Sequence, residues 1–253
     1  MNATDQQSGQ AGAKPTIVLV HGAFADASSW NGVIELLQRQ GYTVIAPPNP
    51  LRGVTADSAY TASLLGQIDG PVLLVGHSYG GAVITNAATN APNVAGLVFV
   101  AAFAPDEGEK LGDVEAGSKD SVLNSALVQY QFPAGDGGET AVEFAINPAL
   151  LREAFAADLP EQQTALMAAT QRPVAAAAFS DVSGPAAWKK LPSWAVVATG
   201  DKAAGADLVR AEAQRAGADI IEVEGSHVIM ISQPQTVTDH ILKAAQALAS
   251  PHR

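Results

Sequence analysis

Residues 71–84, PVLLVGHSYGGAVI, constrain this chain most, because they join a buried strand directly to a helix. The apolar run at 72–75 is typical of a buried strand, and a helical pattern begins at 82–84. The turn between them, GHSYG, needs glycine, since a side chain would crowd so tight a bend. Such a turn holds Ser78 at a strained, exposed point with its hydroxyl directed away from the backbone. The alternative is a glycine-rich turn that carries an ordinary exposed serine.

The composition excludes several classes of protein. The chain has 253 residues, of which 47% are hydrophobic and 15% charged, so it can bury a large core. The net charge of −11 argues against a nucleic-acid-binding protein, which needs a basic face, and against attraction to anionic membranes. The chain contains no cysteine, which excludes disulfides, thiolate nucleophiles and cysteine–zinc sites. We expect neither a metal nor a cofactor.

The N-terminal residues 1–14 are polar and lack the basic and apolar regions of a signal peptide, so we expect a disordered lead-in. No apolar stretch approaches the roughly 20 residues that span a bilayer. The sequence therefore predicts a cytoplasmic protein without a membrane span. An exported protein whose signal had been removed would have the same start.

Strands and helices alternate along most of the chain. Helical patterns separate the apolar runs, and this alternation predicts an α/β fold with a mainly parallel sheet of about six strands and helices on both faces. The expected strands are 16–20, 42–46, 72–75, 97–101, 194–198 and 220–224.

The alternation stops between residues 105 and 190, where no strong strand signal is present. Helical patterns occur at 148–157, 161–170 and 173–179, and glycine and proline are frequent at 133–138. We therefore predict a core of residues 15–104 and 191–253 with an inserted helical cap at 105–190. Long insertions of this kind are usually functional lids. The alternative is a set of rim helices without a role in the site.

Three chemically matched side chains follow predicted strands: Ser78 after the third, Asp201 after the fifth and His227 after the sixth. Ligand chemistry in open parallel sheets lies outside the carboxyl ends of the strands. A serine hydroxyl is a poor nucleophile until a base takes its proton, and histidine can do so near pH 7. A carboxylate on the far ring nitrogen fixes the histidine tautomer. The order Ser…Asp…His is that of α/β-hydrolases.

The acid has a rival. Asp106 also follows a strand, but Asp201 is favoured because it comes after the insertion and directly before the strand that leads to His227. Either residue could instead be a helix cap or a loop acid.

The other histidines have weaker claims to be the base. His252 lies in the tail, and His240 lies within the last helix and is expected to face solvent. His77 is too close to Ser78 in sequence to reach it in the required geometry. His21 ends the first strand and is expected to form structural hydrogen bonds.

An acyl-transfer site also needs hydrogen-bond donors for the oxyanion. The backbone N–H of Tyr79 is one candidate, and Ala23, in the loop after the first strand, is the other. The expected apolar pocket residues are Phe24, Phe103, Trp188 and Val228, with Tyr79 and the insertion residues Phe132, Met167 and Phe179 as further candidates.

At these residues the chain resembles the α/β-hydrolase superfamily, and within it the small cofactor-independent esterases that include plant methylesterases and hydroxynitrile lyases. The resemblance covers residues 15–249 and rests on VLVHGA at 18–23, GHSYGG at 76–81, TGD at 199–201 and EGSH at 224–227. It implies a triad of Ser78, Asp201 and His227. The lyases carry lysine directly after this histidine, whereas this chain has Val228, which favours an esterase.

The sequence thus predicts a carboxylesterase that acts on small, largely apolar esters through an acyl-enzyme. A lyase or perhydrolase with the same triad is one alternative, and a ligand receptor with vestigial hydrolysis is another. The expected partner is a small-molecule ester. The oligomeric state stays open, with a dimer as one option.

Overall fold

The computed structural model describes residues 13–135 and 137–249. The predicted lead-in at 1–14, apart from its last two residues, and His252 lie outside this part of the chain. No helix within the described part combines the length and the hydrophobicity that a bilayer crossing requires.

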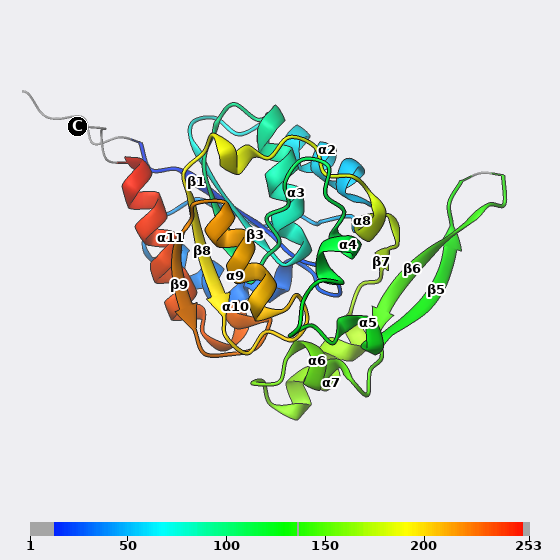
Figure 1. Cartoon of the computed structure of the whole chain (residues 1–253). Helices are drawn as coiled ribbons and strands as arrows, with labels where there is room; N and C mark the ends of the chain where they lie inside the picture. Colours follow the sequence, from blue (N-terminus) through cyan, green and yellow to red (C-terminus); the bar gives the residue numbers. More distant parts are fainter. Residues whose placement is uncertain (1–12, 136, 250–253) are drawn as a thin grey trace, which may run out of the picture.

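A six-stranded sheet forms the centre of the molecule (Figure 1), as predicted. All of its neighbouring strands pair in parallel. The residues at 72–75 are fully buried because helices cover both faces of the sheet. In spatial order the strands are β2 (Val44–Ile45), β1 (Thr16–Val20), β3 (Val72–His77), β4 (Val94–Val100), β8 (Ser193–Ala198) and β9 (Asp219–Val223).

The helices of the core pack in two groups, with α1 against α11 and α2 against α3. Helix α1 shows why: Val33 and Leu37 are buried, while Glu35 and Arg39 on the opposite side form an exposed ion pair. The core helices are α1 (Asn31–Arg39), α2 (Val54–Leu65), α3 (Tyr79–Ala87), α9 (Ala206–Arg215), α10 (Ile229–Ser232) and α11 (Pro234–Ala249), with short 3-10 turns η1 (Ala27–Trp30), η2 (Ala88–Asn90) and η3 (Ala187–Lys189).

The insertion at 105–190 is helical only in part. Its helices are α4 (Leu111–Glu115), α5 (Leu123–Ala126), α6 (Leu151–Phe155), α7 (Glu161–Thr170) and α8 (Ala177–Ser180). It also contains a three-stranded antiparallel sheet in the order β5-β6-β7, formed by β5 (Leu127–Pro133), β6 (Thr140–Ile146) and β7 (Val174–Ala175). The expectation that this segment lacks strands is therefore wrong, and the helix expected at 173–179 is a short strand followed by α8.

The missed strands have a recognisable cause. The sequence at 133–138, rich in glycine and proline, predicts a break between helices, but the segments on its two sides, β5 and β6, pair as a hairpin. Strands β5 and β6 pair along their whole lengths and project away from the central sheet (Figure 1). Because the hairpin is mostly exposed or half-buried, it lacks the continuous apolar run that reveals the strands of the core.

Candidate active site

Ser78 lies at a sharp turn between β3 and α3. Its backbone has φ 53° and ψ −125°, an unusual conformation for a residue with a side chain. The glycines around it are required by close backbone approach. A Cβ on Gly76 would lie 2.6 Å from the carbonyl oxygen of Gly80, and one on Gly81 would collide with the carbonyl oxygen of Phe103. The strained elbow predicted from the sequence is therefore present, but the expectation that Ser78 is exposed is wrong, because the residue is only 7% exposed.

Asp201 and His227 come together at the carboxyl ends of β8 and β9. The Oδ2 atom of Asp201 lies 2.8 Å from Nδ1 of His227, and both side chains are buried. The other carboxylate oxygen accepts hydrogen bonds from the backbone N–H groups of Ala203, at 2.9 Å, and Ala204, at 3.0 Å. These bonds fix the carboxylate, and the carboxylate in turn keeps a proton on Nδ1, which leaves Nε2 free to accept one.

The Nε2 atom of His227 is buried and has no hydrogen-bond partner among the described residues. His227 and Ser78 line the same small cavity, of about 10 Å³. The hydroxyl of Ser78 therefore borders the same cavity as this unpaired nitrogen, without a hydrogen bond between the two side chains.

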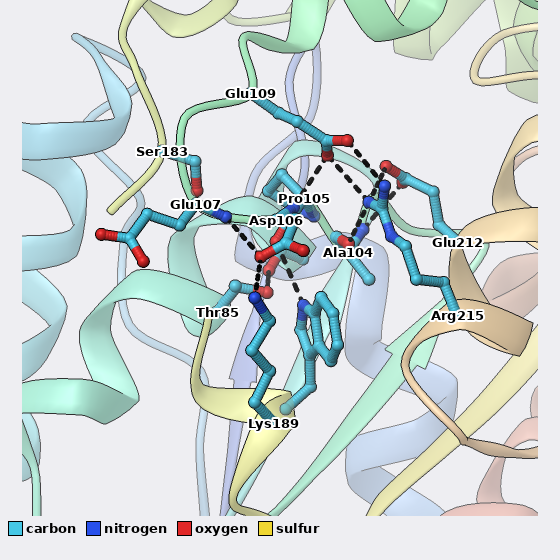
Figure 2. Close-up of polar contacts among 12 residues, drawn as sticks. Thr85, Ala104, Pro105, Asp106, Glu107, Glu109, Ser183, Lys189, Glu212 and Arg215 are labelled. Atoms are coloured by element: carbon cyan, nitrogen blue, oxygen red, sulfur yellow. Dashed lines mark hydrogen bonds and ion pairs between the residues drawn. The ribbon is translucent and has the colours of Figure 1, made fainter. Parts of the chain in front are cut away.

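Asp106, the rival acid, lies elsewhere. Figure 2 shows its carboxylate directed at Lys189, and Oδ1 lies 2.5 Å from Nζ of that lysine. The backbone N–H of Glu107 donates to the same oxygen at 2.6 Å. The hydrogen bond from Lys189 lowers the pKa of this carboxyl. Asp106 therefore takes part in a surface network with Lys189, whereas the partner of His227 Nδ1 is Asp201.

The two expected oxyanion donors also border the cavity beside Ser78, because Ala23 and Tyr79 both line it. Tyr79 is the first residue of α3, where backbone N–H groups have no partner within the helix. The loop that carries Ala23 passes very close to the elbow, since a Cβ on Gly22 would lie 2.7 Å from Cβ of Ser78.

Of the other predicted pocket residues, Phe24, Phe103 and Phe179 line the cavity at Ser78. Val228 instead lines a neighbouring cleft, together with Met167. Trp188 lines neither of these spaces, and its indole N–H donates to the carbonyl oxygen of Pro105 at 3.1 Å.

A family model described as the alpha/beta hydrolase family matches residues 17–240. The chain belongs to this family. The match spans the elbow and the loops that carry Asp201 and His227.

Curated relatives of this alpha/beta hydrolase match parts of the chain. A carbendazim-hydrolysing esterase from a Nocardioides species is 35% identical over 107 residues, which cover 37% of this chain and 44% of the relative. A pyrethroid hydrolase from Sphingobium wenxiniae is 36% identical over 100 residues, covering 34% and 35%. The matched segments thus span less than half the length of these relatives.

Solved structures agree with the fold over nearly the whole chain. Polyneuridine aldehyde esterase superposes with a TM-score of 0.78 at 22% identity, covering 92% of this chain and all of that structure (100%). A pyrethroid hydrolase superposes with a TM-score of 0.75 at 20% identity, covering 93% and 99%. At these identities the likeness shows the fold.

The hydrolase core contains two buried contacts that sequence analysis missed. The phenol of Tyr79 donates to Oδ2 of Asp57 at 2.7 Å, and burial raises the pKa of both groups. His77 donates from Nε2 to the carbonyl oxygen of His227 at 2.9 Å, and burial lowers its pKa well below the ordinary value. A neutral His77 therefore holds the backbone of the candidate base. A buried histidine within the elbow was the available signal for this role.

The prediction for His21 is confirmed, and the prediction for His240 is wrong. His21 forms structural hydrogen bonds as expected: its Nε2 accepts from the N–H of Asn49 at 2.9 Å. The expectation that His240 faces solvent is wrong, because it is 3% exposed and its Nε2 lies 2.9 Å from the carbonyl oxygen of Asp219. Helix α11 buries this side because it packs on the sheet.

The insertion contacts the loop of the candidate base directly. Asp158, between α6 and α7, accepts a hydrogen bond from the N–H of Ser226 at 2.9 Å and a second, short one from its hydroxyl. Ser226 precedes His227 in the chain, so Asp158 links the two regions. Within the described residues no group of three or more metal-binding side chains comes together.

Proposed function

We propose that this protein is a serine carboxylesterase that acts on small-molecule esters. The observation that carries the proposal is the combination of Ser78 at a strained elbow with a buried His227 that is bonded to Asp201 and has an unpaired Nε2 at the same cavity. The names of the two curated relatives, an esterase and a hydrolase, support ester-type substrates.

The proposed reaction begins with attack of Ser78 Oγ on the ester carbonyl carbon, while Nε2 of His227 takes the hydroxyl proton. The carbonyl oxygen becomes an oxyanion that accepts hydrogen bonds from the N–H groups of Ala23 and Tyr79. When the tetrahedral intermediate collapses, the C–O bond to the alcohol breaks, and His227 gives its proton to the departing oxygen. An acyl-enzyme on Ser78 remains.

The second half of the reaction uses water as the nucleophile. His227 takes a proton from the water as its oxygen attacks the acyl carbon, and the same oxyanion donors stabilise the new intermediate. Collapse releases the carboxylic acid and returns the proton to Ser78. Throughout, Asp201 keeps its negative charge and stabilises the imidazolium form of His227.

We further propose that residues 105–190 act as a cap over this site. Four residues of the insertion, Leu111, Leu123, Phe155 and Phe179, line the cavity at Ser78. Asp158 supports this role, since it links the insertion to the loop of His227. A cap in this position excludes water and forms part of the substrate pocket.

The test is the steady-state hydrolysis of 4-nitrophenyl acetate by the wild type and by Ser78→Ala. We expect kcat to fall by about 10⁶, the scale found when a triad serine is removed. Ser63→Ala is the matched control, because Ser63 is an exposed serine on α2. Turnover by Ser78→Ala close to the wild-type rate would contradict the proposal, and a single turnover followed by arrest in the wild type would indicate a receptor.

A further inference from the structure

Two spaces of very different size meet at the candidate site. The cavity that Ser78 and His227 line has a volume of about 10 Å³, enough for roughly one water molecule. The neighbouring cleft measures about 340 Å³, a size typical of sites that bind small molecules. The cleft lies between α7 of the insertion, the loop after β1 and the residues that follow His227.

Phe24 forms part of a wall that the two spaces share, because it lines both of them. Its backbone is in the left-handed region at φ 61°, where a residue with a side chain is held only by its surroundings. Its ring meets the ring of Phe155 edge-on, with centroids 6.2 Å apart, and the Phe155 ring lies 5.1 Å from that of His227. The wall is therefore built from packed aromatic side chains.

The cleft is amphipathic. Phe24, Met167 and Val228 contribute apolar surface, and Asp26 and Gln163 contribute polar groups. The hydroxyl of Ser28 donates to Asp26 at 2.5 Å, and this bond lowers the pKa of the carboxyl, which is therefore ionised at neutral pH. An acceptor of this kind suits a neutral ligand with hydroxyl groups and disfavours a second anion.

The residues next to the reacting groups indicate which part of an ester enters the cleft. Phe24 follows the oxyanion residue Ala23 in the chain, and Val228 follows His227. The alcohol oxygen takes its proton from His227 as it leaves, so the alcohol part lies on the side of His227. The acyl part then lies in the small cavity, enclosed by Phe103, Leu111 and Phe179.

We propose that the cleft beside α7 is the alcohol subsite and that Phe24 limits the acyl subsite, so the substrates are esters of short acids with larger, neutral, amphipathic alcohols. This inference rests on the proposed esterase function.

Two ester series test the assignment. One keeps the acetyl group and compares methyl acetate with 2-(4-hydroxyphenyl)ethyl acetate, and the other compares 4-nitrophenyl acetate with 4-nitrophenyl octanoate. For the wild type we expect kcat/KM to be at least about tenfold higher for the larger acetate, and at least about tenfold lower for the octanoate than for 4-nitrophenyl acetate. Preference for both methyl acetate and the octanoate would overturn the inference.

Variants of α7 locate the alcohol group. Met167→Trp fills the cleft and should lower the ratio of kcat/KM for the large acetate to that for methyl acetate by at least about tenfold. Gln163→Trp should lower the same ratio. Because Gln163 is exposed, we expect this variant to fold normally. Leu166→Trp is the matched control, since Leu166 is on the same helix and 64% exposed, and its ratio should stay within about twofold of the wild type.

Phe24→Ala tests the wall. It should remove part of this shared wall, enlarge the small cavity and raise the ratio of octanoate to acetate hydrolysis by at least about tenfold. Unchanged ratios in Gln163→Trp and Phe24→Ala, with Ser78-dependent hydrolysis intact, would overturn the subsite assignment alone. If the wild type hydrolyses none of these esters faster than Ser78→Ala does, the esterase proposal and the subsite assignment are both overturned.

Discussion

Asp106 and Asp201 follow neighbouring strands of one sheet, β4 and β8, which pair in parallel. Asp201 is 1% exposed, and its carboxylate accepts from two backbone N–H groups and from His227. The side chain of Asp106 is 31% exposed and pairs with Lys189. Two acids at similar places in the topology thus have quite different surroundings.

The difference arises from partners that are distant in sequence. On the β4 side, helix α9 holds the loop: Glu212 accepts from the N–H of Ala104 at 2.9 Å, and Arg215 donates to the carbonyl oxygen of Ala104 at 3.1 Å (Figure 2). Arg215 also forms a two-pronged ion pair with Glu109. These contacts hold the chain on both sides of Asp106 against α9, and the Asp106 carboxylate pairs with Lys189. The Asp201 carboxylate, in the loop after β8, instead bonds to His227. A position after a strand therefore identifies candidate acids, and the loop contacts decide between them.

The largest expected effect concerns Asp201→Asn. Asparagine keeps the shape and can still accept from Ala203 and Ala204, but it lets His227 adopt the wrong tautomer. We expect kcat for 4-nitrophenyl acetate to fall by about 10⁴ near neutral pH, the scale of the same replacement in another serine hydrolase. Thermal unfolding should remain cooperative. If the variant folds normally and keeps more than a tenth of wild-type activity, Asp201 is not the acid that orients His227.

A smaller effect is expected in the pH dependence of stability, caused by Glu212 in the contacts that hold the loop of Asp106. Burial raises the pKa of Glu212 from 4.5 to about 7, so the folded protein binds this proton more tightly than the unfolded chain. The stabilising effect of the proton is present at low pH and is lost as the pH rises toward 7. From pH 5 to pH 8, the free energy of unfolding of the wild type should fall by about 2–3 kcal/mol relative to Glu212→Gln.

Chemical denaturation at several pH values measures this difference, because titrating groups shared by both proteins cancel. Of the charged groups near Glu212, Arg215 lowers its pKa and Glu109 raises it. Parallel stability profiles for the wild type and Glu212→Gln would show that Glu212 titrates normally in the folded state.

The smallest effect is expected for Asp106→Asn. An exposed ion pair such as that with Lys189 contributes only about 0–1 kcal/mol, so stability should barely change. Turnover should stay within about threefold of the wild type, as for a surface substitution away from the site. The same ester and pH as for Asp201→Asn make the two values directly comparable. A loss of about a thousandfold in Asp106→Asn would assign the triad acid to the loop after β4.

The sequence predicted the features that local pattern controls. The apolar run of β1 and the helix α7 were located at their observed bounds, 16–20 and 161–170. The hairpin of β5 and β6 was missed because its strands are not buried on both faces. The bonds of Asp57 to Tyr79 and of His77 to His227 were missed because they join residues 22 and 150 positions apart. The choice between Asp106 and Asp201 needed the same kind of distant contact.

Labelling with a serine-directed fluorophosphonate tests the central claim, that Ser78 is the nucleophile, most directly. The reagent forms a stable bond to an activated serine oxygen, and mass spectrometry of the digested protein identifies the modified residue. We expect one label per chain, on the peptide that contains Ser78, and none on Ser78→Ala under the same conditions. Label on another serine with Ser78 unmodified, or equal labelling of Ser78→Ala, would contradict the account.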